Sequence, residues 1–364
     1  MAARLGFGCM RLPLAERDGR RTVDMAELRR MVDAFLDSGF DCFDVAPTYC
    51  EGLCEDAVRR ALTERHPRSR YRLCDKLPVM QIADAAHQER TFGEQLIRCG
   101  VERFDRYLVH CATEGFWLRA EALGSFDFVL RKRDEGLVGE AGFSFHGSPE
   151  LLDRILTQYA SMDLVQLQIN YLDWELTSVC ARRCYETARR HGKRVVAMCT
   201  QKGGLLAAVP PSAERILRRA DSTLSPSEWA LRFAASPDGV DTVLSGMSSL
   251  REVRRNCKTM QRVQPMDGYE LEVLAQAAAE IAAAAPVQCT GCGYCVAGCP
   301  SKIPIPECLS YCNSTSGSGL RTRPVAAAEC SGCGNCERIC PQRLPIIESL
   351  RRVAAEVRRG GAAV

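Results

Sequence analysis

The residues best suited to carry chemistry lie in two cysteine-rich runs in the last quarter of the sequence. The first run reads Cys289-x2-Cys292-x2-Cys295-x3-Cys299-Pro300, and the same spacing returns 41 residues later as Cys330-x2-Cys333-x2-Cys336-x3-Cys340-Pro341. Thiolates two residues apart can hold one metal centre from a tight loop, and four thiolates are the usual ligand set of an iron–sulfur cluster. Two copies of the run therefore predict two metal centres.

The similarity between the two runs extends beyond the cysteines. At the same offset the matching pairs are Gly291/Gly332, Gly293/Gly334, Pro304/Pro345, Ile305/Ile346, Glu307/Glu348 and Leu309/Leu350. Self-similarity at a fixed offset indicates a duplicated unit. The stretch 287–350 resembles a two-cluster bacterial ferredoxin.

That resemblance implies which cysteines share a metal centre. In the bacterial ferredoxin run the fourth cysteine reaches across to the other cluster. One 4Fe-4S cluster is then expected at Cys289, Cys292, Cys295 and Cys340, and the other at Cys330, Cys333, Cys336 and Cys299. Structural zinc is the alternative because zinc also accepts four cysteines, but zinc ribbons do not require this spacing followed by proline.

Length and composition limit the possible classes of protein. A chain of 364 residues is long enough for a barrel of about 250 residues and a small module. The net charge of +3 gives no indication of nucleic-acid binding. We expect no membrane contact and a cytoplasmic location, because the sequence has no signal-like or membrane-spanning apolar run. A reducing cytosol also suits the 21 cysteines.

The elements that must position other functional residues alternate between short apolar runs and amphipathic segments, which is the pattern of a parallel sheet with helices. The expected strands are Leu5–Cys9, Phe40–Asp44, Tyr71–Lys76, Arg106–His110, Val138–Ser144, Leu164–Asn170, Arg194–Cys199 and Thr242–Ser245. The expected helices include Met25–Asp37, Glu55–Glu64, Ala120–Asp134 and Cys180–His191. Eight such units predict an α/β fold, a (β/α)8 TIM barrel, followed by a small α+β dicluster ferredoxin-like domain. Active sites of such barrels lie at the C-terminal ends of the strands.

Four polar residues lie at or just after the ends of expected strands. Asp44 ends the second strand and Tyr49 follows it, while Lys76 and His110 end the third and fourth strands. A buried Lys lowers the pKa of a nearby Tyr phenol, and an Asp paired with that Lys keeps it charged. Tyr49 is therefore expected to be the proton donor to a carbonyl group whose oxygen His110 orients.

The sequences around these four residues resemble the motifs of the aldo-keto reductase family. They are "FDVAPTYCEG", "CDKLP" and "RYLVHC", and weaker matches such as "GFSFHG", "QLQIN" and "KGGLL" follow in the same order over residues 4–258. The resemblance implies carbonyl–alcohol interconversion with a nicotinamide cofactor. It also implies that Ser144 and Gln166 hold the nicotinamide carboxamide; Gln168 is an alternative in register, and Asn170 lies on the same face.

The dinucleotide phosphates are expected at the start of the last barrel helix. The candidate residues are Gly246, Ser248, Ser249 and Asn256. Backbone N–H groups at a helix start suit an anion. The chain departs from many relatives by carrying Met247, Glu252 and Arg255 where they place a Lys or Arg and a Glu, so the choice between NADH and NADPH is left open. Arg251 or Arg254 is a candidate for the missing positive charge.

The sequence thus predicts three parts: a barrel over 1–262, a linker helix over 263–286 and a ferredoxin-type domain over 287–364. The expected function is NAD(P)H-dependent conversion of a small carbonyl or alcohol substrate, joined to an iron–sulfur electron-transfer module. The alternative is an electron-transfer protein whose barrel binds another redox cofactor, such as flavin, or docks a partner.

An acidic redox carrier, such as a ferredoxin or flavodoxin, is a candidate partner. From residue 289 onward the sequence holds nine Lys or Arg against five Glu and no Asp. The arginines concerned are Arg321, Arg323, Arg338, Arg343, Arg351, Arg352, Arg358 and Arg359. A positive surface would attract such a carrier, although the same arginines could instead balance the charge of the clusters or be solvated.

Overall fold

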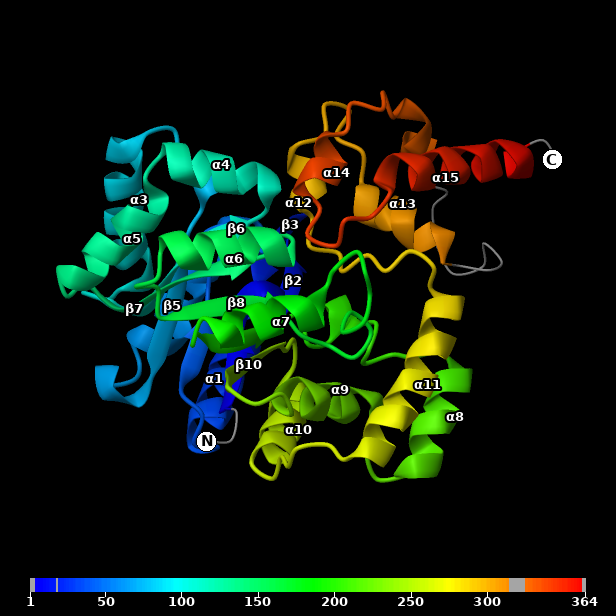
Figure 1. The fold of residues 1–364 in the computed structure, drawn as a ribbon, viewed down its shortest axis with the longest axis horizontal. Helices are drawn as coiled ribbons and strands as arrows, with labels where there is room; N and C mark the ends of the chain where they lie inside the picture. Colours follow the sequence, from blue (N-terminus) through cyan, green and yellow to red (C-terminus); the bar gives the residue numbers. More distant parts are fainter. Residues whose placement is uncertain (1–3, 18, 314–324, 362–364) are drawn as a thin grey trace. The chain divides into compact units, whose positions relative to one another are not determined.

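A computed structural model describes residues 4–17, 19–313 and 325–361 of the chain (Figure 1). The chain divides into two compact units. Unit 1 runs from the start of the chain to Glu175 and adds Cys180–Thr200 and Glu228–Asp267, whereas unit 2 consists of Leu176–Val179, Gln201–Ser227 and the chain from Gly268 onward. The domain boundaries at residues 262 and 286 stay a prediction. The boundaries of the two compact units lie at other residues.

Unit 1 contains a closed barrel of eight parallel strands in the order β1-β10-β9-β8-β7-β6-β5-β4. The strands are β1 Arg4–Gly8, β4 Cys42–Asp44, β5 Arg72–Leu77, β6 Phe104–Ala112, β7 Val138–Phe145, β8 Leu164–Gln168, β9 Arg194–Met198 and β10 Val240–Gly246. Each expected strand overlaps one of these. The (β/α)8 barrel predicted from the sequence is therefore confirmed.

Strand alternation decides which side chains lie inside the barrel. Five buried residues from five strands form one apolar cluster: Cys74, Leu108, Leu164, Val196 and Leu244. Residues two positions further along a strand point the same way, one layer nearer the C-terminal end. This places Lys76, His110 and Gln166 inside the barrel. The parallel register pairs Asp44 with Cys74 and Ser144 with Gln166, so these two residues share that interior face.

Two glycines make room for the apolar layer. A Cβ atom at Gly6 would lie 2.6 Å from the Leu244 side chain, and one at Gly142 would lie 2.8 Å from the Leu164 side chain. Such contacts are shorter than real carbon atoms allow. Any larger residue at either position would therefore push this layer toward the polar residues above it.

Helices connect and surround the strands (Figure 1). Those of unit 1 are α1 Met25–Asp37, α2 Cys54–Val58, α3 Ala85–Cys99, α4 Glu114–Ala122, α5 Ser125–Asp134, α6 Pro149–Gln158, α7 Ala181–Arg190, α9 Pro226–Ala235 and α10 Leu250–Met260, whereas α8 Pro211–Ala220 belongs to unit 2. Helix α1 begins where expected because the Asp24 carboxylate accepts the N–H groups of Ala26 and Glu27, both at 3.0 Å. Its apolar face, which includes Phe35, is buried.

Two parts of unit 1 differ from the sequence-based expectation. The helix expected over Ala120–Asp134 is broken, because Gly124 adopts a left-handed conformation with φ 63° between α4 and α5. An antiparallel hairpin of β2 Leu14–Arg17 and β3 Arg20–Val23, absent from the prediction, precedes α1. Gly19 has φ 69° in its turn, a conformation that favours glycine.

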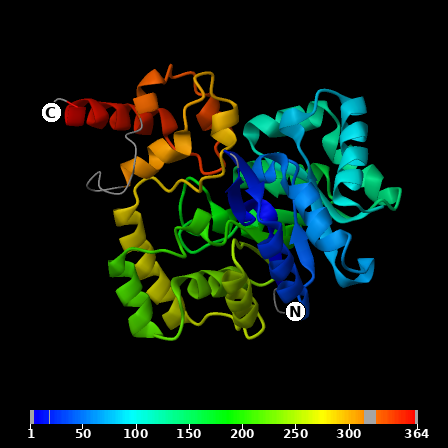
Figure 2. The same cartoon turned by 180° about the vertical axis from the view of Figure 1, so that it is seen from behind.

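Unit 2 combines two long helices with the cysteine-rich segment. Helix α8 packs against α11 Gly268–Ala284, and the two lie side by side in both views (Figures 1 and 2). The remaining helices are α12 Tyr294–Ala297, α13 Ile305–Cys312, α14 Asn335–Ile339 and α15 Ile346–Gly361. Buried residues of α13 and α15, including Leu309 and Leu350, form a core with the cysteine loops. Those two leucines are a matched pair of the sequence repeat.

Among the described residues, no helix has the length and apolar character needed to span a membrane. Of the arginines expected to attract a redox carrier, Arg321 and Arg323 lie outside the described residues, and Arg359 belongs to α15. The other five are exposed: Arg338, Arg343, Arg351, Arg352 and Arg358.

Candidate functional site

The centre of the barrel site is a buried ion pair between β4 and β5. The Lys76 Nζ donates to Asp44 Oδ1 at 2.6 Å and to the Val45 carbonyl at 2.8 Å. The two side chains are only 1% and 4% exposed. The same Nζ lies 4.9 Å from the centre of the Tyr49 ring, so the lysine contacts the ring face. The structure thus brings together three of the four residues predicted to act as one group.

His110 completes this group from β6. Its ring lies edge-on to the Tyr49 ring, with a distance of 6.1 Å between ring centres. Burial, together with the charge of Lys76 and the neighbouring His146, lowers the pKa of His110 well below its usual value. A neutral imidazole in this position can direct a carbonyl oxygen by hydrogen bonding without itself adding a charge.

The pKa of Tyr49 shifts in the opposite direction to the expectation. Burial raises the pKa of Tyr49 well above 10, and the Asp44 carboxylate raises it further. For Lys76, burial alone would lower the pKa, but Asp44 outweighs it and the net pKa lies above the usual value. The expected net lowering of the Tyr49 pKa by Lys76 is not seen, because burial of the phenol and the Asp44 carboxylate outweigh the stabilisation that the lysine gives the phenolate. Tyr49 therefore keeps its proton at neutral pH.

Residues behind β5 hold Lys76 in place from outside the barrel. The Gln95 amide donates to the Lys76 carbonyl at 3.0 Å and accepts a hydrogen bond from the Tyr107 hydroxyl at 2.6 Å. Both Gln95 and Tyr107 are fully buried. Because these contacts fix the β5 backbone at Lys76, they also fix the position of the Cα atom from which the lysine side chain extends.

Ser144 and Gln166 lie as neighbours in the parallel register of β7 and β8, and both are 2% exposed. The Ser144 Oγ accepts the Cys111 N–H at 2.7 Å, which leaves its own proton to donate. The Gln166 Oε1 is buried and has no hydrogen-bond partner among the described residues. A buried acceptor of this kind fits a ligand that brings an N–H group, such as a carboxamide.

Asn170 does not share this role in the structure. Its Oδ1 accepts the N–H groups of Leu172 and Asp173, and its Nδ2 donates to the Asp173 carboxylate at 2.7 Å and to the Cys199 carbonyl at 3.1 Å. These bonds fill its hydrogen-bonding capacity and shape the turn after β8. Gln168, the alternative in register to Gln166, is 5% exposed on β8.

The start of α10, which follows Gly246 at the end of β10, was expected to bind phosphate. The Leu250 N–H is bound by the Glu27 carboxylate at 2.7 Å, and the Ser248 N–H by the Glu252 carboxylate at 2.7 Å. Ser249 caps the helix by accepting the Glu252 N–H. Two carboxylates therefore occupy the N–H groups at which an anion was expected. Their negative charges disfavour binding of a phosphate there.

Asn256, in the second turn of α10, keeps one polar atom for a ligand. Its Nδ2 donates to the Ser245 hydroxyl at 3.2 Å, while its buried Oδ1 has no partner in the described part of the chain. Arg251 and Arg254 lie on the same helix, and Arg251 is exposed. The role of Glu27 was missed by sequence reasoning because it belongs to α1 and no local motif connects it to α10.

The thiols beside Tyr49 are not activated. Cys50 and Cys54 both point their sulfur atoms at the Cys9 carbonyl, at 3.6 Å. Burial raises the pKa of Cys50 to about 11 and that of Cys54 well above its usual value. Both remain protonated thiols at neutral pH and pack as small side chains.

Trp117 is a packing residue rather than part of a substrate-binding loop. It lies on α4, is 4% exposed and packs edge-on against Phe126 and Tyr159. Phe116 and Trp117 are helical, and Thr113 caps α4 by accepting the Phe116 N–H.

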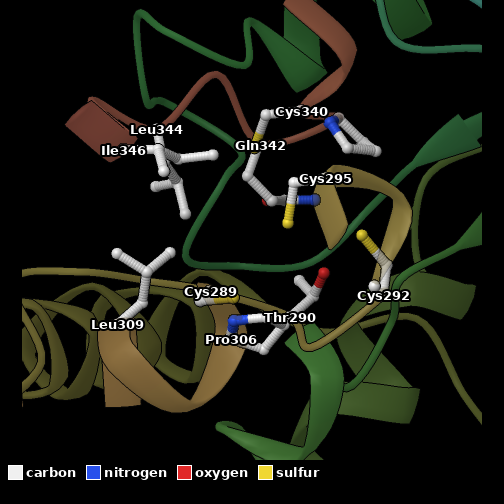
Figure 3. A pocket seen from close by; sticks show the side chains of 12 residues that line it. Cys289, Thr290, Cys292, Cys295, Pro306, Leu309, Cys340, Gln342, Leu344 and Ile346 are labelled. Carbon is white, nitrogen blue, oxygen red and sulfur yellow. The ribbon is translucent and has the colours of Figure 1, made fainter. Parts of the chain in front are cut away.

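In unit 2 the cysteines gather around two pockets. The first is lined by Cys289, Cys292, Cys295 and Cys340 together with mostly apolar residues (Figure 3). The second is lined by Cys299, Cys330, Cys333 and Cys336. This is the grouping that the ferredoxin resemblance implies, with the fourth cysteine of each run at the other pocket. The space at each pocket, part of it open to solvent, is about 310 Å³.

The loops carrying the cysteines turn sharply at glycines. Gly291 and Gly293 have φ of 64° and 78°, and Gly332 and Gly334 have φ of 72° and 78°. These left-handed conformations let the chain wrap a compact centre with sulfur atoms two residues apart. The thiolate donor sets and the apolar linings fit two iron–sulfur clusters.

The comparisons with known proteins support both parts of this description. The sequence model of the Aldo/keto reductase family matches residues 4–277, and that of a 4Fe-4S dicluster domain matches residues 288–354. A comparison with curated proteins gave no match.

Several solved structures are similar in fold. The holo form of an aldo-keto reductase from Bacillus halodurans gives a TM-score of 0.61 at 22% identity, over 76% of this chain and 92% of that one. An aldo/keto reductase from Klebsiella pneumoniae in complex with NADP and acetate gives 0.57 at 18% identity, over 75% and 90%. Because the first family match spans well over half of the sequence and the barrel agrees with it, the chain belongs to the aldo/keto reductase family and carries a 4Fe-4S dicluster domain.

Proposed function

We propose that the barrel interconverts a small carbonyl compound and its alcohol with a nicotinamide cofactor. The observation that carries this proposal is the buried Lys76–Asp44 pair beneath a protonated Tyr49, with a neutral His110 beside it. A protonated phenol next to a neutral hydrogen-bonding imidazole is the arrangement that carbonyl reduction requires.

The roles of these residues follow from their charges. Tyr49 gives its proton to the carbonyl oxygen as that oxygen becomes an alkoxide, and His110 orients the same oxygen. Lys76 stabilises the phenolate that remains, from its position over the ring face. Asp44 keeps Lys76 charged and fixed in place. Bound nicotinamide supplies the hydride.

Ser144 and Gln166 are proposed to hold the carboxamide of the nicotinamide. The unused Gln166 Oε1 accepts its N–H group, and the Ser144 hydroxyl can donate to its oxygen. Asn256 Oδ1 offers a further acceptor near β10. NADP bound to the Klebsiella pneumoniae relative agrees with a nicotinamide cofactor in this family. Glu27 and Glu252 favour NADH, which carries less negative charge than NADPH.

The eight cysteines of the repeated runs are proposed as ligands of two 4Fe-4S clusters in the groups that line the two pockets. When bound, such clusters supply one-electron transfer. Exposed arginines near them favour an acidic one-electron carrier as partner. Arg351 lies beside a ligand loop, because its side chain is 3.7 Å from where a Cβ would sit on Gly332.

The decisive test is Tyr49→Phe in protein purified without oxygen. We expect reduction of a model aldehyde by NADH to fall by at least about a hundredfold, because only the proton donor is lost. Binding of NADH, followed by its fluorescence, should persist. The matched control is Tyr71→Phe, which alters a buried tyrosine just before β5 and should leave the rate unchanged. Unchanged turnover in Tyr49→Phe would refute the proposal.

The carboxylates at the start of α10 favour a second function. If no nicotinamide binds there, the barrel serves as the scaffold of an electron-transfer protein and holds another redox cofactor, with flavin as the candidate. Anaerobic purification followed by analysis of iron, sulfide and bound organic cofactor distinguishes the two. Bound flavin without measurable NADH or NADPH binding would favour this second function.

A further inference from the structure

The two cysteine pockets correspond residue by residue but differ at one strongly polar position. Each residue that lines the first pocket has a counterpart 41 positions away that lines the second. Thr290 and Ser331 both bring a hydroxyl group. The clear difference is Gln342, whose counterpart is Ser301. The duplication therefore supplies an internal control, since whatever Gln342 adds is added to one pocket alone.

Gln342 is held in place by a buried lysine. The Lys202 Nζ donates to the Gln342 Oε1 at 2.5 Å, and the two residues are 1% and 5% exposed. Because its oxygen accepts from Lys202, the amide presents its N–H groups as donors, and Gln342 lies among the cysteines of the first pocket (Figure 3). At the second pocket the Ser301 hydroxyl donates instead to the Glu329 carbonyl at 3.1 Å.

The turn that carries Lys202 is fitted closely to a ligand loop. A Cβ atom on Gly203, which has φ 67°, would lie 2.5 Å from the Thr290 carbonyl oxygen. Thr290 directly follows Cys289. Lys202 itself has φ 46°, a left-handed conformation that non-glycine residues rarely adopt. The backbone is thus strained to bring an ammonium group beside the first pocket.

We infer that Lys202, acting through Gln342, raises the midpoint potential of the cluster at Cys289, Cys292, Cys295 and Cys340 above that of the other cluster. Reduction adds one electron, so a buried cation and N–H groups near the sulfur atoms stabilise the reduced state. This inference rests on the proposed cluster ligands. Lys202 and Gln342 are positioning residues, since neither is a ligand.

The order of potentials gives a direction to electron flow. Cys333 of the second pocket is exposed, so a one-electron carrier is expected to deliver its electron there. The electron then passes to the first cluster, which holds it more tightly, and no bond is made or broken. The first cluster is then the one that is reduced at equilibrium when the protein holds one added electron.

The test is a potentiometric titration of the full chain without oxygen, followed by electron paramagnetic resonance. Lys202→Met and Gln342→Leu preserve side-chain size and remove the cation or the amide. We expect each substitution to lower the higher of the two midpoint potentials by at least about 59 mV. For one electron this corresponds to about a tenfold fall in the equilibrium constant for reduction. The lower potential should stay unchanged. Ser301→Ala, at the counterpart position, should leave the higher potential unchanged.

Gln342→Glu covers the case in which the other variants fold poorly, because it keeps the bond to Lys202 and replaces the N–H groups with a negatively charged oxygen. The same fall is expected. Iron and sulfide are measured first: wild-type protein without two clusters overturns the proposed ligands. Three outcomes overturn this inference but not the proposed ligands. They are equal midpoint potentials of the two clusters, midpoint potentials that do not change on substitution, and midpoint potentials that both shift by the same amount.

Discussion

At the scale of single residues, the barrel site depends on one lysine whose charge is shared. Lys76 lies between the Asp44 carboxylate and the Tyr49 ring. Its ammonium group donates a hydrogen bond to the carboxylate and contacts only the face of the ring. Tyr49 is therefore a protonated acid at neutral pH, and not a residue already prepared to accept a proton. If the proposed reaction is correct, a protonated Tyr49 suits the direction of carbonyl reduction at neutral pH.

This leads to a prediction about pH. Reduction requires protonated Tyr49, whose pKa lies well above 10, and neutral His110, whose pKa lies well below 6.5. At saturating cofactor the reduction rate should stay flat from about pH 6.5 to pH 10. Alcohol oxidation requires the phenolate and should rise about tenfold per pH unit over the same range. A loss of reduction below pH 10 in stopped-flow measurements would contradict this assignment.

The buried ion pair also predicts an effect on stability. Lys76→Met leaves the Asp44 carboxylate buried without its partner, which should cost about 3–5 kcal/mol in the free energy of unfolding. Urea denaturation of the metal-loaded protein measures this change. The double variant Lys76→Met/Asp44→Asn removes the remaining charge and should recover part of the loss. Equal stability of the single and double variants would show that the charge is not the cause.

At the scale of elements, helix α10 shows how a familiar binding feature is modified by its neighbours. Its N-terminus would attract an anion, yet Glu27 from α1 and Glu252 from its own first turn satisfy the N–H groups of Leu250 and Ser248. A helix start with its own carboxylates in place binds a further phosphate poorly.

Glu252→Gln should therefore strengthen binding of NADPH more than of NADH. Glutamine can still accept the Ser248 N–H, but the negative charge is lost. Repulsion between unit charges about 4 Å apart in a water-like medium is about 1 kcal/mol, so the dissociation constant for NADPH should fall roughly fivefold. Titration of cofactor fluorescence measures it. Glu186→Gln, on α7, is the control and should change neither constant.

The sequence predicted the elements better than their contacts. Apolar runs located all eight strands, and the positions of Lys76 and His110 at strand ends placed them at one mouth of the barrel. The β2–β3 hairpin was missed because its strands, Leu14–Arg17 and Arg20–Val23, are short and polar. The break between α4 and α5 depends on the left-handed Gly124, which the helical pattern around it concealed.

Contacts between distant segments lay beyond the sequence for a physical reason. The grouping of cysteines across two loops was predictable because the repeated runs resemble those of a two-cluster bacterial ferredoxin, in which the fourth cysteine binds the other cluster. The Glu27–Leu250 bond and the Lys202–Gln342 bond depend on how separate helices and turns pack, and neither has a local pattern. The burial of Tyr49, which sets its pKa, is likewise a property of the packed fold.

At the scale of the whole molecule, the two proposed chemistries differ in how many electrons they move. Nicotinamide gives up two electrons as a hydride, whereas each cluster accepts one. NADH or NADPH alone should therefore not bleach the cluster absorbance at the rate of carbonyl turnover. Anaerobic mixing with flavin-free protein tests this, and addition of flavin as a mediator is the positive control. Bleaching at the turnover rate without a mediator would show direct exchange.

A last consequence concerns the order in which the chain is made. Gln342 is synthesised 140 positions after Lys202, a wait of roughly 7 to 28 s at about 5–20 residues per second. During this time the turn after β9 has neither Thr290 nor Gln342 to pack against, and α8 has no α11. We therefore expect the segment Gln201–Ser227 to adopt its final structure only after the cysteine loops have bound iron. In cells starved of iron, limited proteolysis should cut Gln201–Ser227 before the strands of the barrel, and protection should return when iron and sulfide are restored.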